Sequence, residues 1–198
     1  MKTGFSQNNE EELILNYFGD FKGRILEIGA CDGLMASNTR QLILNGWGGV
    51  LIEPGEVFLK LQELYKDNPN IKMYKLAIGN KNGKFKFWDS GEGISTFNEE
   101  HRDKWIKHGV NYKETEVDMI SVDKLFELVG YDFEMISLDT EAMNFEIFKS
   151  LPFDKLTKLR LICVEHDKKY EMMKYMLDSY GFKEIAMNQE NIIFAKEK

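Results

Sequence analysis

The chain is 198 residues long, 43% hydrophobic and 30% charged. This composition supports a buried core in one or two compact domains and argues against a disordered, collagen-like or coiled-coil protein. The net charge of −7 is scattered along the sequence, so we expect neither nucleic acid nor an anionic membrane as a partner. Two cysteines without CxxC spacing, and a sequence without an apolar leader or a membrane-spanning run, predict a soluble, cytoplasmic protein.

Short aliphatic runs alternate with amphipathic segments in the first half of the chain. Apolar residues recur at helical spacing between Leu13 and Phe18, before Gly19, and predict an opening helix within residues 1–20. The elements expected next are a strand at 24–29, a helix at 38–45, a strand at 50–53, a helix that begins at 54–55 and a strand at 71–78. This β-α-β-α-β series is typical of a parallel sheet.

The alternation resumes after a less regular middle. Residues 84–88 have the pattern of a half-buried antiparallel strand, whereas residues 89–116 predict an irregular or short helical segment that covers a site. Ser121 is the expected N-cap of the next helix. The remaining elements are helix 122–129, strand 134–139, helix 144–151, strand 158–165, helix 168–180 and a hairpin of strands 182–187 and 191–196. We therefore predict one α/β domain, 1–198, whose mainly parallel sheet has helices on both faces and one antiparallel edge strand.

The strongest local feature is the turn after the first strand, which contains Gly29 and Gly33. Glycines allow a backbone to approach a ligand closely. The spacing departs from GxGxxG, because Cys31 holds the place of the second glycine, and this argues against NAD and FAD. Glu27, within the strand, would suit the cationic amino group of an amino-acid moiety. A tight turn without a ligand is the alternative.

Glu53 ends the second strand. A carboxylate at this point can accept both hydroxyls of a ribose, because neighbouring parallel strands end in the same crevice. Ala77 and Ile78, at the end of the third strand, would offer a small apolar wall to an adenine ring. The alternatives are an acid that stabilises a helix N-terminus for Glu53 and ordinary core packing for the other two.

Three polar residues at strand ends are candidates for catalysis. Asp139 ends one strand, and Glu165 ends the next in the series, followed directly by His166. Carboxylates and an imidazole that converge on one edge of a sheet suit general acid/base chemistry or a hard divalent cation. Each acid is alternatively a helix N-cap. We predict no metal site, although a divalent cation is left open.

These residues together resemble the FkbM-type methyltransferases, a branch of the class I S-adenosylmethionine-dependent enzymes. The matching stretches occur in family order and are 26–33, 37–39, 46–54, 76–79, 136–141 and 164–166. The resemblance implies a Rossmann-like, doubly wound, seven-stranded sheet. It also implies S-adenosylmethionine as cofactor, S-adenosylhomocysteine as product, and methyl transfer to a hydroxyl of a small molecule, most often a sugar or glycan.

The resemblance also implies positions around the cofactor. Those expected near its methionine part are Glu27, Gly29 and Gly33, and those expected near the ribose and adenine are Glu53, Ala77 and Ile78. The other implied pocket residues are Ala30, Asp32, Ser37, Asn38 and Pro54. Residues 89–116 would form the lid for the acceptor, and the candidates for the base are Asp139, Glu165 and His166.

Two residues depart from the family pattern. Ala142 stands where the family often has a glycine, and Asn144 stands where it often has a second acid. These departures motivate the alternative of a catalytically inactive, methyltransferase-like binding module. An NAD-dependent oxidoreductase is a further rival, which the glycine spacing disfavours. A homodimer is left open.

Overall fold

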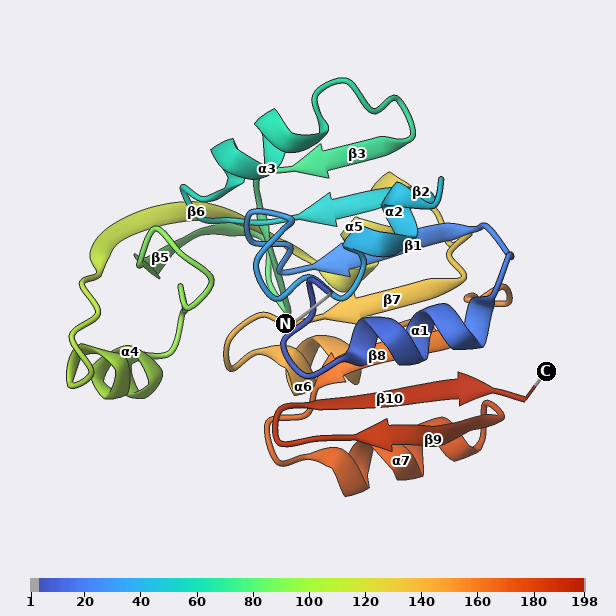
Figure 1. Ribbon diagram of the computed structural model, residues 1–198. Helices are drawn as coiled ribbons and strands as arrows, with labels where there is room; N and C mark the ends of the chain where they lie inside the picture. The colour runs from blue at the N-terminus through green and yellow to red at the C-terminus, as the bar shows by residue number, and fades with distance from the viewer. Residues whose placement is uncertain (1–3, 198) are drawn as a thin grey trace.

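The computed structural model of the protein describes residues 4–197 and contains a seven-stranded main sheet beside a smaller, three-stranded sheet (Figure 1). The main sheet has the strand order β3-β2-β1-β7-β8-β10-β9. Its strands are β1 (Arg24–Ile28), β2 (Gly48–Ile52), β3 (Ile71–Tyr74), β7 (Met135–Leu138), β8 (Leu161–Glu165), β9 (Phe182–Met187) and β10 (Asn191–Lys196). Within residues 4–197, no helix is long and apolar enough to cross a membrane.

Five strands, from β3 to β8 in the sheet order, run parallel to one another. The hairpin of β9 and β10 completes the sheet, and β10 is antiparallel to both of its neighbours. The predicted fold class, a doubly wound and mainly parallel sheet with an antiparallel strand at one edge, is therefore confirmed. The strand order reverses between β1 and β7, and ligands of such sheets bind in the crevice at this switch point.

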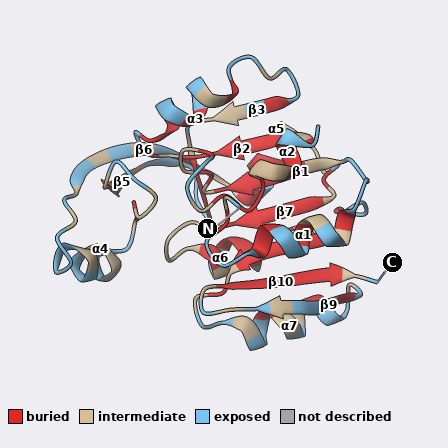
Figure 2. Ribbon diagram, viewed as in Figure 1, coloured by how far each residue is buried: buried red, intermediate tan, exposed pale blue. Residues whose placement is uncertain are grey.

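Helices cover both faces of the main sheet, each over its own apolar core. On one face lie α1 (Glu10–Phe18), α2 (Arg40–Leu44) and α3 (Phe58–Tyr65), and on the other α5 (Val122–Val129), α6 (Asn144–Phe148) and α7 (Tyr170–Asp178). Figure 2 shows the strands between these layers as mostly buried. The Ser121 side chain accepts a hydrogen bond from the Lys124 amide, which confirms the predicted N-cap of α5.

The small sheet lies beyond the carboxyl ends of the parallel strands (Figure 1). It contains β4 (Ala77–Gly79), β5 (Gly83–Asp89) and β6 (Lys113–Ser121), and α4 (Glu99–Ile106) lies in the connection between β5 and β6. The expected continuous strand at 71–78 is wrong, because β3 pairs with β2 in the main sheet whereas β4 pairs with β6. The alternation of apolar and polar residues continues through both strands. The two strands are distinguished by the strands with which they pair.

The strand β6 was not predicted from the sequence. Four of its nine residues are Lys, Glu or Asp, residue types that are depleted in strands. Pairing with β5 compensates, since Lys86 lies opposite Glu116 and its Nζ lies 3.3 Å from Oε1 of the diagonal neighbour Glu114. Segment 89–116 thus contains α4 in its middle and the first residues of β6 at its end.

Candidate active site

A cavity of about 260 Å³ opens at the carboxyl ends of β1, β2 and β7, where the strand order reverses. The structure brings most of the expected cofactor residues to it. Those that line the cavity are Glu27, Gly29, Ala30, Ser37, Asn38, Glu53, Pro54, Ala77 and Ile78. Asp32 and Gly33 do not line it.

The turn after β1 can be formed only with glycine at its first position. Gly29 has φ +88°, and a Cβ added there would lie 1.6 Å from the carbonyl oxygen of Asp139. The amides of Gly29 and Ala30 both donate to the Ile52 carbonyl at 2.9 Å. The ends of β1, β2 and β7 are therefore in backbone contact, which leaves no room for a side chain at position 29.

Asp32 and Gly33 shape the turn from behind the cavity wall. The Asp32 carboxylate accepts the amides of Leu34 and Met35, each at 2.8 Å. Gly33 has φ +76°, and an added Cβ would lie 2.7 Å from the Leu61 side chain of α3. Both residues therefore stabilise the conformation of the turn and its packing against α3. The sequence pattern did not distinguish this conformational role from ligand binding.

Glu27 is a buried carboxylate in the middle of β1. It is 5% exposed, and it accepts a hydrogen bond from Thr39 Oγ1 at 2.8 Å. Burial raises the pKa of Glu27 to about 8, and the Thr39 hydrogen bond opposes this only in part. A group of this kind is stabilised when a ligand brings positive charge to it.

The raised pKa of Glu27 predicts that the cofactor-free protein loses stability as pH rises. Its pKa is 4.5 when unperturbed and about 8 in the fold, so its contribution is fully present below pH 4.5 and is lost as pH rises towards 8. We expect the free energy of unfolding of Glu27→Gln to fall less between pH 5.5 and 7.5 than that of the wild type, by roughly 2 kcal/mol. Urea unfolding at both pH values measures this, with the exposed Glu114→Gln as control. Equal pH dependence of wild type and Glu27→Gln would contradict it.

Glu53 follows the end of β2 and is 7% exposed. Its Oε2 accepts the amide of Cys31 at 3.0 Å, and its Oε1 accepts the amide of Gly55 at 2.8 Å. Burial raises the pKa of Glu53 to about 7, while these two hydrogen bonds lower it. The carboxylate is thus fixed in direction at the cavity wall.

Asn38 supplies an unsatisfied acceptor to the same wall. The residue is 5% exposed, and its Oδ1 has no hydrogen-bond partner within residues 4–197. A buried polar atom without a partner is costly unless a ligand or water satisfies it. Together with Glu27 and Glu53, this atom offers hydrogen-bond acceptors to an amino group and to hydroxyls, which fits a nucleoside that carries an amino-acid moiety.

Of the three candidates for catalysis, the structure places only Asp139 in the lining of the cavity. Burial raises the pKa of Asp139, and the charge of Glu141 raises it further. Glu165 lies behind it, where Asn144 Nδ2 donates to its Oε2 at 2.6 Å, and burial and the charge of Asp139 raise the pKa of Glu165. These two acids therefore form one partly buried pair at the ends of β7 and β8.

His166 does not reach the cavity. Its Nδ1 accepts the amide of Lys168 at 3.0 Å, and its Nε2 lies 3.3 Å from the carbonyl oxygen of Asn188. Both ring nitrogens are occupied by the backbone, so the imidazole holds the turn after β8 to the terminal hairpin. The position of His166 directly after a strand did not distinguish this structural role from a catalytic one.

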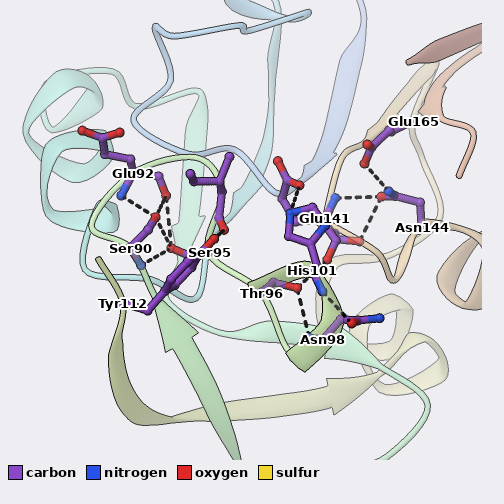
Figure 3. Close-up of polar contacts among 12 residues, drawn as sticks. Ser90, Glu92, Ser95, Thr96, Asn98, His101, Tyr112, Glu141, Asn144 and Glu165 are labelled. Carbon is purple, nitrogen blue, oxygen red and sulfur yellow. Dashed lines mark hydrogen bonds and ion pairs between the residues drawn. The ribbon is translucent and has the colours of Figure 1, made fainter. Parts of the chain in front are cut away.

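Two contacts that no pattern of the sequence indicates join the segment before β6 to the loop after β7 (Figure 3). Thr96 Oγ1 donates to the Glu141 carbonyl at 2.8 Å, and His101 Nε2 of α4 lies 3.0 Å from Glu141 Oε2. The aromatic rings of Phe87 and Phe97, whose centroids are 4.7 Å apart, also line the cavity. These residues come from segments without periodicity, so only the tertiary structure brings them here.

Ala142 has φ +83°, a conformation that favours glycine. The family's usual glycine at this position is thus explained by the backbone. We expect Ala142→Gly to raise the free energy of unfolding by up to about 1 kcal/mol, because relief of the left-handed strain exceeds the added chain entropy. Urea unfolding measures this, with Ala186→Gly in β9 as a control that should destabilise. A loss of stability in Ala142→Gly would contradict the assignment of strain.

The doubly wound sheet, its strand order and a cavity with acidic strand ends at the switch point define a Rossmann-like α/β protein with a ligand site at that point. The sequence matches the Methyltransferase FkbM domain family over residues 27–184. The chain belongs to this family, whose members are S-adenosylmethionine-dependent methyltransferases. Among residues 4–197, no group of three or more His, Cys, Asp and Glu side chains is suited to hold a metal ion.

Solved structures of methyltransferases share the fold. The FkbM methyltransferase of Methylobacillus flagellatus KT superposes with a TM-score of 0.55 at 13% sequence identity over 88% of this chain, and the present chain spans 44% of its length. The precorrin-6y C5,15-methyltransferase of Geobacter metallireducens GS-15 gives a TM-score of 0.52 at 10% identity, covering 100% of this chain and 93% of that one. A comparison with curated protein sequences gave no match.

Proposed function

We propose that this chain transfers the methyl group of S-adenosylmethionine to a hydroxyl of a small molecule, with a sugar or glycan as the acceptor class. The observation that carries the proposal is the position of Asp139. It is a partly buried carboxylate with a raised pKa, and it lines the same cavity as the two acids suited to the cofactor. A base at this point serves the removal of a proton from a hydroxyl.

The cofactor would be held by residues at the ends of β1 and β2 and in β4. Glu27 would accept the amino group of its methionine part, Glu53 the ribose hydroxyls, and Ala77 and Ile78 would contact the adenine ring. Gly29 leaves the space in which the backbone approaches the ligand. When bound, the cofactor supplies a sulfonium-activated methyl group that a hydroxyl oxygen can attack.

Asp139 takes the proton of that hydroxyl in this proposal. The charge of Asp139 acts on the neighbouring Glu165, and Asn144 Nδ2 donates to Glu165 Oε2 at 2.6 Å, so the pair has a set geometry. Glu165 therefore acts as a positioning residue. Segment 89–116 would cover the acceptor and keep water from the reacting atoms, which raises the effect of every charge in the cavity.

Thermal unfolding of the full chain tests which cofactor the protein binds. We expect S-adenosylmethionine and S-adenosylhomocysteine to raise Tm in a saturable way and NAD to leave it unchanged, since only ligands of the folded state stabilise it. Glu53→Gln should lower the affinity for S-adenosylhomocysteine about tenfold, because a charge-assisted hydrogen bond is lost. Glu114→Gln, on the small sheet, is the matched control. Stabilisation by NAD alone would overturn the proposal.

Transfer itself is tested with methyl-labelled S-adenosylmethionine and a panel of sugars, glycosides and hydroxylated metabolites. Label on an acceptor oxygen, located by mass spectrometry and NMR, would support an O-methyltransferase. Cofactor binding without label on any acceptor would instead favour the catalytically inactive binding module.

A further inference from the structure

The charges around the cavity point to the class of acceptor. Resting on the function proposed above, we propose that Glu141 is the counter-ion of a protonated amine on the acceptor, so that the acceptor is an amine-bearing hydroxyl compound such as an amino sugar. Glu141 is then the residue that determines specificity, whereas Asp139 takes part in the chemistry.

The lining of the cavity contains acidic residues and no basic ones among the described residues, and the basic neighbour of Glu141, His101, lies outside the lining. The charged residues of the lining are Glu27, Glu53, Glu92, Asp139 and Glu141, and none of the described residues in the lining is Lys, Arg or His. Asn38 Oδ1 adds a buried acceptor that has no partner within residues 4–197 and belongs to the same wall. A wall of acceptors requires donors from its ligands, because each unsatisfied acceptor is costly when water is displaced.

The cofactor does not use all of these acids. Glu27 and Glu53 lie at the ends suited to its amino group and ribose, which leaves Asp139, Glu141 and Glu92 on the side of the segment that precedes β6. Figure 3 shows the Glu141 and His101 side chains beside each other, next to Asn144 of α6.

The protein fixes Glu141 in an unfavourable backbone conformation. Glu141 has φ +52° and Ala142 has φ +83°, and Thr96 holds the Glu141 carbonyl at 2.8 Å. The Glu141 side chain is 19% exposed, which keeps it reachable from the cavity while limiting screening by water. His101 Nε2 lies 3.0 Å from the carboxylate but makes no hydrogen bond with any described residue, so the carboxylate retains capacity for a better donor.

An ammonium group satisfies these conditions better than the alternatives. It makes short, charge-assisted hydrogen bonds with a carboxylate, whereas a phosphate or carboxylate on the acceptor would be desolvated against acids with no cation in the lining. Its positive charge would also favour the ionised form of Asp139, the form that accepts a proton. The acidic lining therefore disfavours phosphorylated sugars.

Binding of matched sugars tests the inference. The probes are methyl glucoside, its analogue with an amino group in place of the 6-hydroxyl, and its 6-phosphate, titrated calorimetrically into the full chain loaded with S-adenosylhomocysteine. We expect the amino sugar to bind about tenfold more tightly than the parent glycoside, and the phosphate to bind more weakly than both. In Glu141→Gln the preference for the amine should fall to about twofold or less, while the affinity for S-adenosylhomocysteine is unchanged. Glu114→Gln should retain the preference.

The inference is overturned if the amino sugar does not bind, if it binds no better than methyl glucoside, or if its advantage survives in Glu141→Gln. A neutral sugar that binds best and becomes methylated would also overturn it, while the proposed methyl transfer would stand. Failure of the proposed function looks different, because then either S-adenosylhomocysteine would not stabilise the protein or no acceptor of the panel would become labelled.

Discussion

Asp139→Asn should lower kcat for methyl transfer by about 10²–10⁴-fold, because the amide has nearly the shape of the carboxylate but cannot take the acceptor's proton. Affinity for S-adenosylhomocysteine should change by less than about threefold, since the proposed cofactor contacts do not depend on this charge. Initial rates of S-adenosylhomocysteine formation, with the acceptor that reacts best in the panel, measure the first quantity. Calorimetric titration measures the second.

Asp118→Asn is the matched control, because this exposed acid lies on the small sheet with Lys84 Nζ 4.0 Å away. It should keep the wild-type rate. His166→Gln is a second comparison, and we expect at most about a threefold change in kcat, since the imidazole contacts backbone outside the cavity. Full turnover in Asp139→Asn, or a large loss of kcat in a folded His166→Gln, would show that the base is assigned to the wrong residue.

Gly29→Ala should destabilise the fold by about 3 kcal/mol or more, because the new methyl group would meet the Asp139 backbone and the alanine would also adopt a strained φ. The distance of 1.6 Å from the added Cβ to the Asp139 carbonyl requires β1 and β7 to separate. Since the same contact shapes the cavity, stabilisation by S-adenosylhomocysteine should be lost as well. Urea unfolding followed by circular dichroism measures stability, and thermal unfolding with and without ligand measures binding.

Gly109 provides a close control for this substitution. It has the same φ of +88°, but a Cβ added there meets nothing within 4 Å. Gly109→Ala should therefore cost only the conformational strain, about 1 kcal/mol, and should retain ligand binding. If both alanine variants lost the same free energy of unfolding, the close approach of β1 and β7 would have no energetic consequence and the explanation of Gly29 would be wrong.

Much of the fold follows from local patterns of the sequence. Runs such as the one that forms β8 are continuously apolar because both of their faces are covered, and this property is visible without the structure. The boundary between β3 and β4 was not visible, because a continuous alternation does not say where a chain changes its pairing partner. For β6, the cross-strand partners in β5 compensate for a sequence with weak preference for a strand.

The candidate site shows the same division. Residues directly at strand ends, such as Glu53 and Asp139, could be expected in the cavity because parallel strands end at one edge. The sequence could not separate Gly33 or His166 from them, since a residue that shapes a turn and a residue that contacts a ligand occupy the same places in the pattern. Thr96 and His101 gave no signal at all, because their contacts with Glu141 span about 40 residues of chain without periodicity.

The sequence by itself showed that the chain is long enough for one such sheet. It also showed the order of the elements in the main sheet and the family to which the chain belongs. The net charge of −7 argued only against polyanions, and it carried no information on where the acids lie. The tertiary structure decided that five of them line one cavity without a Lys, Arg or His among the described residues of that lining. The physical reason is that hydrophobic periodicity acts between neighbours in the chain, whereas the charge of a cavity is a sum over residues that only folding brings together.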